Sequence, residues 1–131
     1  MGSTFERRRA RVYVAGPISS NIFEGVWRGA AAGRMMFLDG LAPFVPHFDA
    51  FWWLPGGDGP GSEIWKSYLE YDLEYVAVCD AVYRLAGQST GADKECNVAM
   101  NLNIPVFLEA AGEYPELLDF CASLNLTGVH V

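Results

Sequence analysis

Short apolar runs alternate along this chain with longer segments in which apolar residues recur at helical spacing. The short runs, bounded by turn residues, predict strands at 11–15, 42–45, 80–84 and 104–108. The longer segments predict helices at 21–38, 62–77, 91–102 and 115–124. We expect the last residues, 127–131, to add an edge strand.

Strands separated by helices pair in parallel through right-handed crossovers. The pattern therefore predicts an α/β fold: a doubly wound parallel sheet of about five strands with helices on both faces. We expect residues 11–131 to form a single domain and residues 1–10 an N-terminal tail that is able to stay disordered. Such folds bind ligands beyond the carboxyl ends of their strands. These ends lie at Ala15–Pro17, at Pro46–His47 and in the 85–91 segment.

Residues 46–61 are dense in both aromatic residues and glycine, and we expect a long loop there. Long loops are uncommon in compact domains and often carry function.

The composition excludes several classes of protein. With 51% hydrophobic and 19% charged residues, the chain is not intrinsically disordered. A net charge of −7 disfavours nucleic-acid polymers and anionic membranes as partners. No apolar run approaches the ~20 residues of a membrane span, and no signal-peptide pattern follows the basic N-terminus.

Three widely spaced cysteines without a CxxC pair indicate reduced thiols in a cytoplasmic protein, and no metal or cofactor is expected.

Ser89, Thr90 and Gly91 stand where a strand's exit segment meets a helix N-terminus. Free backbone N–H groups favour an anion there, although a serine or threonine at this place often only caps the helix. The spacing is not that of a P-loop. Pro17, directly after Gly16, excludes a dinucleotide-binding turn.

Several side chains are candidates for chemistry. Glu95 lies in the first turn of the helix that starts at the binding edge, where it is either structural or faces the cleft. Asp72 interrupts an apolar helical pattern, and Asp80 opens a strand, where it either caps a helix or binds backbone amides. Tyr13, inside the first strand, either fills the core or reaches the cleft with its hydroxyl.

Together these motifs resemble a known family. The run Val-Tyr-Val-Ala-Gly-Pro-Ile-Ser at 12–19, the Asp72 and Asp80 pair, and Ser-Thr-Gly-Ala-Asp-Lys-Glu at 89–95 are similar to the nucleoside 2-deoxyribosyltransferase superfamily. This superfamily includes the 2′-deoxynucleoside 5′-monophosphate N-glycosidases. The resemblance spans residues 11 to about 108 and implies a flavodoxin-like sheet and a double-displacement reaction.

The resemblance also implies roles for single residues. Glu95 matches the nucleophile that attacks C1′ and displaces the base. Tyr13 matches the tyrosine that orients this glutamate, and Asp72 matches the aspartate that protonates or holds the leaving base. The substrate-binding set also takes in Gly16 and Asp80.

One position departs from the transferase pattern. Transferases carry an acidic residue six positions before the nucleophile, whereas this chain has Ser89, as the nucleotide hydrolases do. Ser89 and the amides near Gly91 would hold a 5′-phosphate that a carboxylate would repel. Ser19 and Ser20 would add donors. Arg28 either supplies a countercharge or is a surface arginine.

The aromatic residues of the 46–61 segment have two interpretations. His47, Phe51, Trp52 and Trp53 could stack on a nucleobase, at ~1–3 kcal/mol for a good stack. The tryptophans could equally fill a subunit interface.

The sequence thus predicts an enzyme that hydrolyses the N-glycosidic bond of (deoxy)nucleoside 5′-monophosphates through a glycosyl-enzyme. A base-exchanging deoxyribosyltransferase is the first alternative, and a non-catalytic nucleotide sensor the second. A flavodoxin-like electron carrier is a less favoured alternative than these two. The family resemblance implies a homodimer or a higher homo-oligomer.

Overall fold

The computed structural model describes residues 5–18 and 21–129. Its strands are β1 (Phe5–Glu6), β2 (Arg11–Ala15), β3 (Ala42–Phe44), β4 (Ala81–Arg84), β5 (Val106–Leu108) and β6 (Gly128–Val129). Its α-helices are α1 (Ile22–Leu38), α2 (Ala50–Gly56), α3 (Trp65–Val76), α4 (Thr90–Asn101) and α5 (Tyr114–Ser123). The short 3₁₀ helices are η1 (Pro46–Asp49) and η2 (Glu109–Ala111). Within these ranges, no helix has the length and apolar character needed to cross a membrane.

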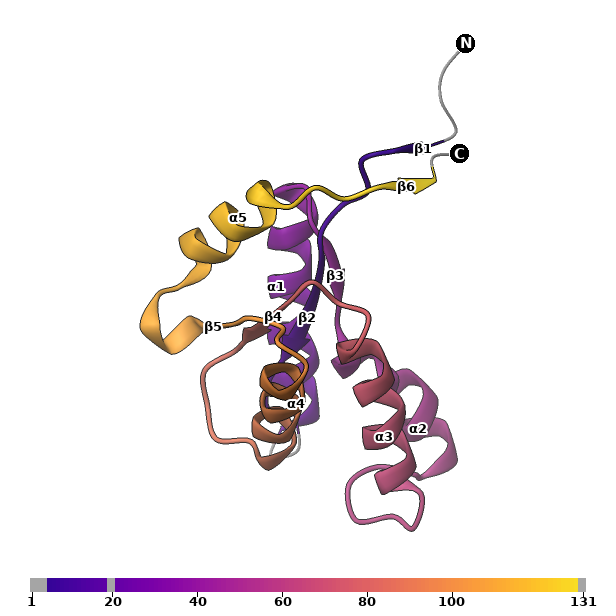
Figure 1. Cartoon of the computed structure of the whole chain (residues 1–131). Helices are drawn as coiled ribbons and strands as arrows, with labels where there is room; N and C mark the ends of the chain where they lie inside the picture. Colours follow the sequence, from indigo (N-terminus) through magenta and orange to yellow (C-terminus); the bar gives the residue numbers. More distant parts are fainter. Residues whose placement is uncertain (1–4, 19–20, 130–131) are drawn as a thin grey trace.

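A four-stranded parallel sheet in the order β3-β2-β4-β5 forms the centre of the fold (Figure 1). The predicted parallel α/β architecture is therefore confirmed. The sheet has four strands, however, and the predicted C-terminal strand forms as β6 but does not join this sheet. After α5 the chain runs away from the sheet, and β6 pairs antiparallel with β1 in a separate two-stranded ribbon.

Alternate residues of β2 face opposite layers of helices. Val12 and Val14 belong to a core cluster with residues of α1 and α5. Tyr13 and Ala15 belong to a second cluster with residues of α3 and α4. This period-2 alternation places helices on both faces of the sheet, as predicted. It also turns the Tyr13 side chain toward α4.

The predicted long loop at 46–61 is wrong, because most of it is helical. Pro46 starts η1, since its fixed φ suits the first helical position. Ala50 and Trp53, three residues apart, are 1% and 3% exposed and anchor α2 against the fold. Gly57 ends α2 with a left-handed φ of 70°, which favours glycine. Figure 1 shows α2 beside α3.

Candidate active site

A cavity of about 370 Å³ lies between η1, α3 and the first turns of α4, at the carboxyl end of β2. Its wall includes seven of the residues that the sequence singles out: Gly16, His47, Trp53, Asp72, Ser89, Gly91 and Glu95. Ligands of doubly wound sheets bind at this edge, so the position agrees with the expectation from topology.

Glu95 and Tyr13 form a hydrogen-bonded pair at this cavity. Tyr13 is completely buried, and its hydroxyl donates to Oε2 of Glu95. Phe44 stacks on the Tyr13 ring at 5.5 Å between centroids and fixes its orientation. Burial raises the pKa of Glu95 to about 8. The hydrogen bond acts in the opposite direction, because donation from Tyr13 favours the carboxylate.

Asp72 and Asp49 form a buried carboxyl pair in the cavity wall. Each residue is only 8% exposed, and the two carboxyl groups act on each other's pKa. Burial, together with the neighbouring Asp49, raises the pKa of Asp72 to about 9, and burial also raises the pKa of Asp49. Two carboxyl groups in contact share a proton rather than ionise together, so we assign one proton to this pair at neutral pH.

His47 is a neutral polar group within the same wall. It is 2% exposed, and burial, followed by repulsion from Arg28, lowers its pKa to about 4. Helix α1 approaches the ring so closely that a Cβ on Gly29 would lie 2.7 Å from the His47 Cγ. Among the described residues, neither ring nitrogen makes a hydrogen bond of ordinary geometry. The imidazole is therefore a buried, neutral group in the cavity wall.

The N-terminus of α4 completes the cavity. Ser89 caps this helix, since its Oγ accepts a hydrogen bond from the Ala92 N–H at 3.1 Å. The capping interpretation is therefore confirmed, although Ser89 also lines the cavity with Thr90 and Gly91. Lys94, in the first turn, adds a cation to the same wall.

Sequence reasoning missed four lining residues with polar or aromatic side chains: Asp49, Trp65, Tyr68 and Lys94. The sequence position of Lys94 could have indicated a place in the site, because Lys94 directly precedes Glu95 in a helix that begins at the binding edge. No feature of the sequence indicated Asp49, because it falls in the segment predicted as a loop. Trp65 meets Trp53 edge-on at 5.4 Å between ring centroids. The two rings give the cavity an aromatic side.

Asp80 does not lie at the cavity, which corrects its assignment to substrate binding. It accepts hydrogen bonds from the Arg8 guanidinium at 2.8 and 3.1 Å and from the Arg11 N–H at 2.8 Å. Burial alone would raise the pKa of Asp80, but these hydrogen bonds outweigh burial and lower it. Asp80 precedes β4, at the amino end of the sheet, and ties the N-terminal segment to it.

Arg28 is also not among the lining residues. Its guanidinium donates to the Ala86 carbonyl at 2.9 Å and pairs with Glu109 at 3.0 Å. It therefore holds the segment between β4 and α4 that leads to Ser89. Ser19 and Ser20, the other predicted donors, lie outside the described residues.

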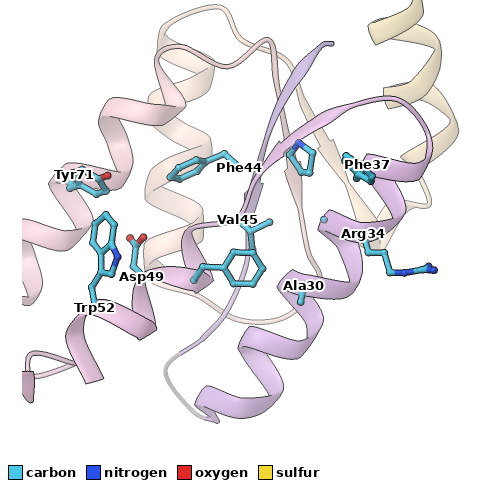
Figure 2. Close-up of a pocket in the computed structure, with 11 residues that line it drawn as sticks. Ala30, Arg34, Phe37, Phe44, Val45, Asp49, Trp52 and Tyr71 are labelled. Atoms are coloured by element: carbon cyan, nitrogen blue, oxygen red, sulfur yellow. The ribbon is translucent and has the colours of Figure 1, made fainter. Parts of the chain in front are cut away.

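Trp52 lies in a second cavity, of about 490 Å³, beside β3. In Figure 2, Trp52, Tyr71 and Asp49 stand on one side of it, and Arg34 and other residues of α1 on the other. Asp49 lines both cavities. The two neighbouring tryptophans thus have different surroundings, with Trp53 in the first cavity and Trp52 in the second.

In the part of the chain that the structure describes, no three His, Cys, Asp or Glu side chains gather as a metal site would require. Cys79, Cys96 and Cys121 are buried free thiols.

Comparison with known proteins gives a family and a fold. The family model described as "Domain of unknown function (DUF4406)" matches residues 10–108. A solved structure of a 2-deoxyribosyltransferase from the psychrotolerant bacterium Bacillus psychrosaccharolyticus is similar, with a TM-score of 0.56 and 23% identity. The match covers 76% of this chain and 71% of that chain, and it confirms the fold. No curated protein matches the chain.

The carboxyl pair predicts how stability depends on pH. The folded pKa of Asp72 lies near 9 and its ordinary value near 3.8, so between these values the folded state holds an extra proton. The free energy of unfolding contributed by Asp72 is therefore complete below about pH 3.8 and is lost as pH rises through 9, at up to ~1.4 kcal/mol per pH unit.

We expect Asp72→Asn to flatten the decline in unfolding free energy between pH 5 and 9, measured by urea denaturation. Asp119→Asn, at an exposed position of α5, is the matched control and should keep the wild-type slope. Equal slopes in wild-type protein and Asp72→Asn would contradict the shared proton.

Proposed function

The chain belongs to this DUF4406 family, and from the cavity we propose that it hydrolyses the N-glycosidic bond of (deoxy)nucleoside 5′-monophosphates. Free base and sugar phosphate are the products. One observation carries the proposal: a tyrosine-held carboxyl, Glu95, shares a single cavity with a buried carboxyl pair. The cavity volume of about 370 Å³ also lies within the range of small-molecule sites.

In the proposed reaction, the Glu95 carboxylate attacks C1′ while the C1′–N bond breaks and its electron pair leaves with the base. Asp72 donates a proton to the departing base. Water then attacks C1′ and releases Glu95, so two displacements retain the configuration at C1′. Because burial raises the pKa of Glu95 to about 8, its ionisation limits the reaction below that pH. The hydrogen bond from Tyr13 supports the ionised form.

The first turn of α4 is suited to the 5′-phosphate. Ser89, Thr90 and Gly91 present a helix N-terminus to the cavity, and Lys94 adds a positive charge. Backbone N–H groups and the helix dipole favour an anion at this place. The aromatic side formed by Trp53 and Trp65 is suited to the base.

Base exchange is the second candidate, and the likeness to a solved 2-deoxyribosyltransferase favours it. In that reaction a second base, instead of water, attacks the glycosyl-enzyme. Incubation with a deoxynucleotide and a different free base distinguishes the two, because only the transferase yields the exchanged nucleotide.

We expect Glu95→Gln to fold and to lose base release by several orders of magnitude, because the amide keeps the size but is not a nucleophile. Base release from a panel of nucleoside monophosphates, followed by chromatography, measures this. Retention of more than about a tenth of the wild-type rate would exclude Glu95, because tenfold is only ~1.4 kcal/mol of barrier.

We expect wild-type protein to prefer a nucleotide to its nucleoside by at least ~10-fold in kcat/KM, since charge-assisted hydrogen bonds contribute ~1.5–3 kcal/mol each. Ser89→Asp should erase this preference through repulsion, while Ser89→Thr, which keeps the hydroxyl, should preserve it. If Ser89→Asp slows nucleosides and nucleotides equally, the phosphate does not bind at α4.

We also propose that the chain forms a homo-oligomer through exposed aromatic side chains. Phe23 and Trp27 of α1 are 88% and 76% exposed, and Phe51 and Trp52 of α2 are 68% and 58% exposed. Exposed aromatic residues of this kind mark interfaces.

Light scattering should give a mass of at least two chains for wild-type protein and one chain for the double variant Phe23→Ser, Trp27→Ser. Val78→Ser, at another exposed apolar position, should leave the mass unchanged. A monomeric wild-type protein would refute the proposal.

A further inference from the structure

Asp49 is a buried polar residue of the cavity to which the proposed reaction as described assigns no role. It ends η1 and is 8% exposed, and its Oδ2 has no hydrogen-bond partner of ordinary kind. The Oδ1 atom of Asp72, on α3, is also buried without a hydrogen-bond partner. An unpaired buried carboxylate costs several kcal/mol, so a fold keeps one only where a proton or a ligand compensates it.

Among the described residues, no Lys, Arg or His forms an ion pair with either carboxyl group of the pair. The titratable and charged groups that face the pair from neighbouring elements are His47, Tyr68, Tyr71, Glu95, Lys94 and Arg34. His47 is neutral, and Lys94 and Arg34 are exposed side chains at the rims of the two cavities. The Tyr68 hydroxyl is directed to Asp58, at 3.4 Å, and the Tyr71 hydroxyl to Tyr75, at 3.1 Å.

We propose that Asp49 is a positioning residue that shares one proton with Asp72 and so keeps on Asp72 the proton that the leaving base takes. This inference rests on the proposed function. Glu95 supplies the nucleophile in the same cavity, and the Asp49–Asp72 pair supplies the acid. Burial is the larger cause of the raised pKa of Asp72, and Asp49 raises it further, so without Asp49 the Asp72 carboxyl group would hold its proton less firmly.

The pair also serves the second half of the reaction. When the C1′–N bond breaks, the proton moves from Asp72 to a base nitrogen, and two carboxylates are left in contact. Repulsion makes this state strongly basic. The attacking water therefore gives one proton back to the pair while its oxygen bonds to C1′ and the C1′–O bond to Glu95 breaks. Atoms and charges balance, and the pair returns to its starting state.

The test is Asp49→Asn, whose amide donates to Asp72 and favours its carboxylate. We expect the alkaline limb of the kcat profile, near pH 9 in wild-type protein, to move down by at least about one pH unit. At pH 8 kcat should fall at least ~10-fold with KM nearly unchanged, because the loss concerns only the transition state. Asp49→Glu, which restores a carboxyl group, should recover most of the rate.

Carbon-13 NMR of the side-chain carboxyl groups tests the shared proton without any turnover. The Asp72 signal should titrate at least about one pH unit lower in Asp49→Asn than in wild-type protein. Asp58→Asn, a carboxyl change on the same segment, should leave it in place. An unchanged Asp72 titration in a folded Asp49→Asn protein would overturn the proposal.

Different measurements would contradict the proposed hydrolysis and the proposed role of Asp49. If Asp72 titrates high in wild-type protein and low in Asp49→Asn, but no base is released from any nucleotide, the proposed function fails and the assignment to a leaving base is overturned with it. If Glu95→Gln abolishes base release while Asp49→Asn keeps the wild-type pH profile, the hydrolase stands and the role of Asp49 is overturned.

Discussion

Three carboxyl groups around one cavity place an electrostatic constraint on this protein. Asp49, Asp72 and Glu95 all line a space of about 370 Å³. Two unit charges 4 Å apart repel by ~4 kcal/mol even at an effective dielectric constant of 20, which is a large part of a domain's stability. The fold can hold the three groups together only if some of them keep their protons. Which carboxyl keeps a proton then decides which group is an acid and which a nucleophile.

The sheet assigns these roles through its alternation. Tyr13 lies on the face of β2 that α3 and α4 cover, so its hydroxyl meets Glu95 while its ring packs in the core. A hydrogen bond to the rigid central strand favours the ionised form of Glu95. Asp72 receives no such donor and meets another carboxyl group instead. Burial thus raises the pKa of both groups, but only Glu95 has a donor that opposes this rise.

The α/β fold and part of the candidate site could be predicted from the sequence. Local periodicity determines strands and helices, and Tyr13, Asp72 and Glu95 lie in a recognisable order. Asp49 could not, since its pairing depends on how η1 packs against α3, and no local pattern records that packing. The assignment of Asp80 to substrate binding is wrong, and its position in the sequence already argues against it. It precedes β4, and in a parallel sheet the residues before a strand lie at the edge opposite to the ligand.

The shared proton also bears on how an acidic chain would hold a phosphate. The net charge of −7 opposes an anionic ligand at long range, so the attraction must be local. The α4 N-terminus and Lys94 provide it, but the carboxyl groups in the same wall would cancel it if all were ionised. A proton held between Asp49 and Asp72 removes one of these charges. Retaining that proton would therefore favour phosphate binding at α4 and base departure at Asp72 together.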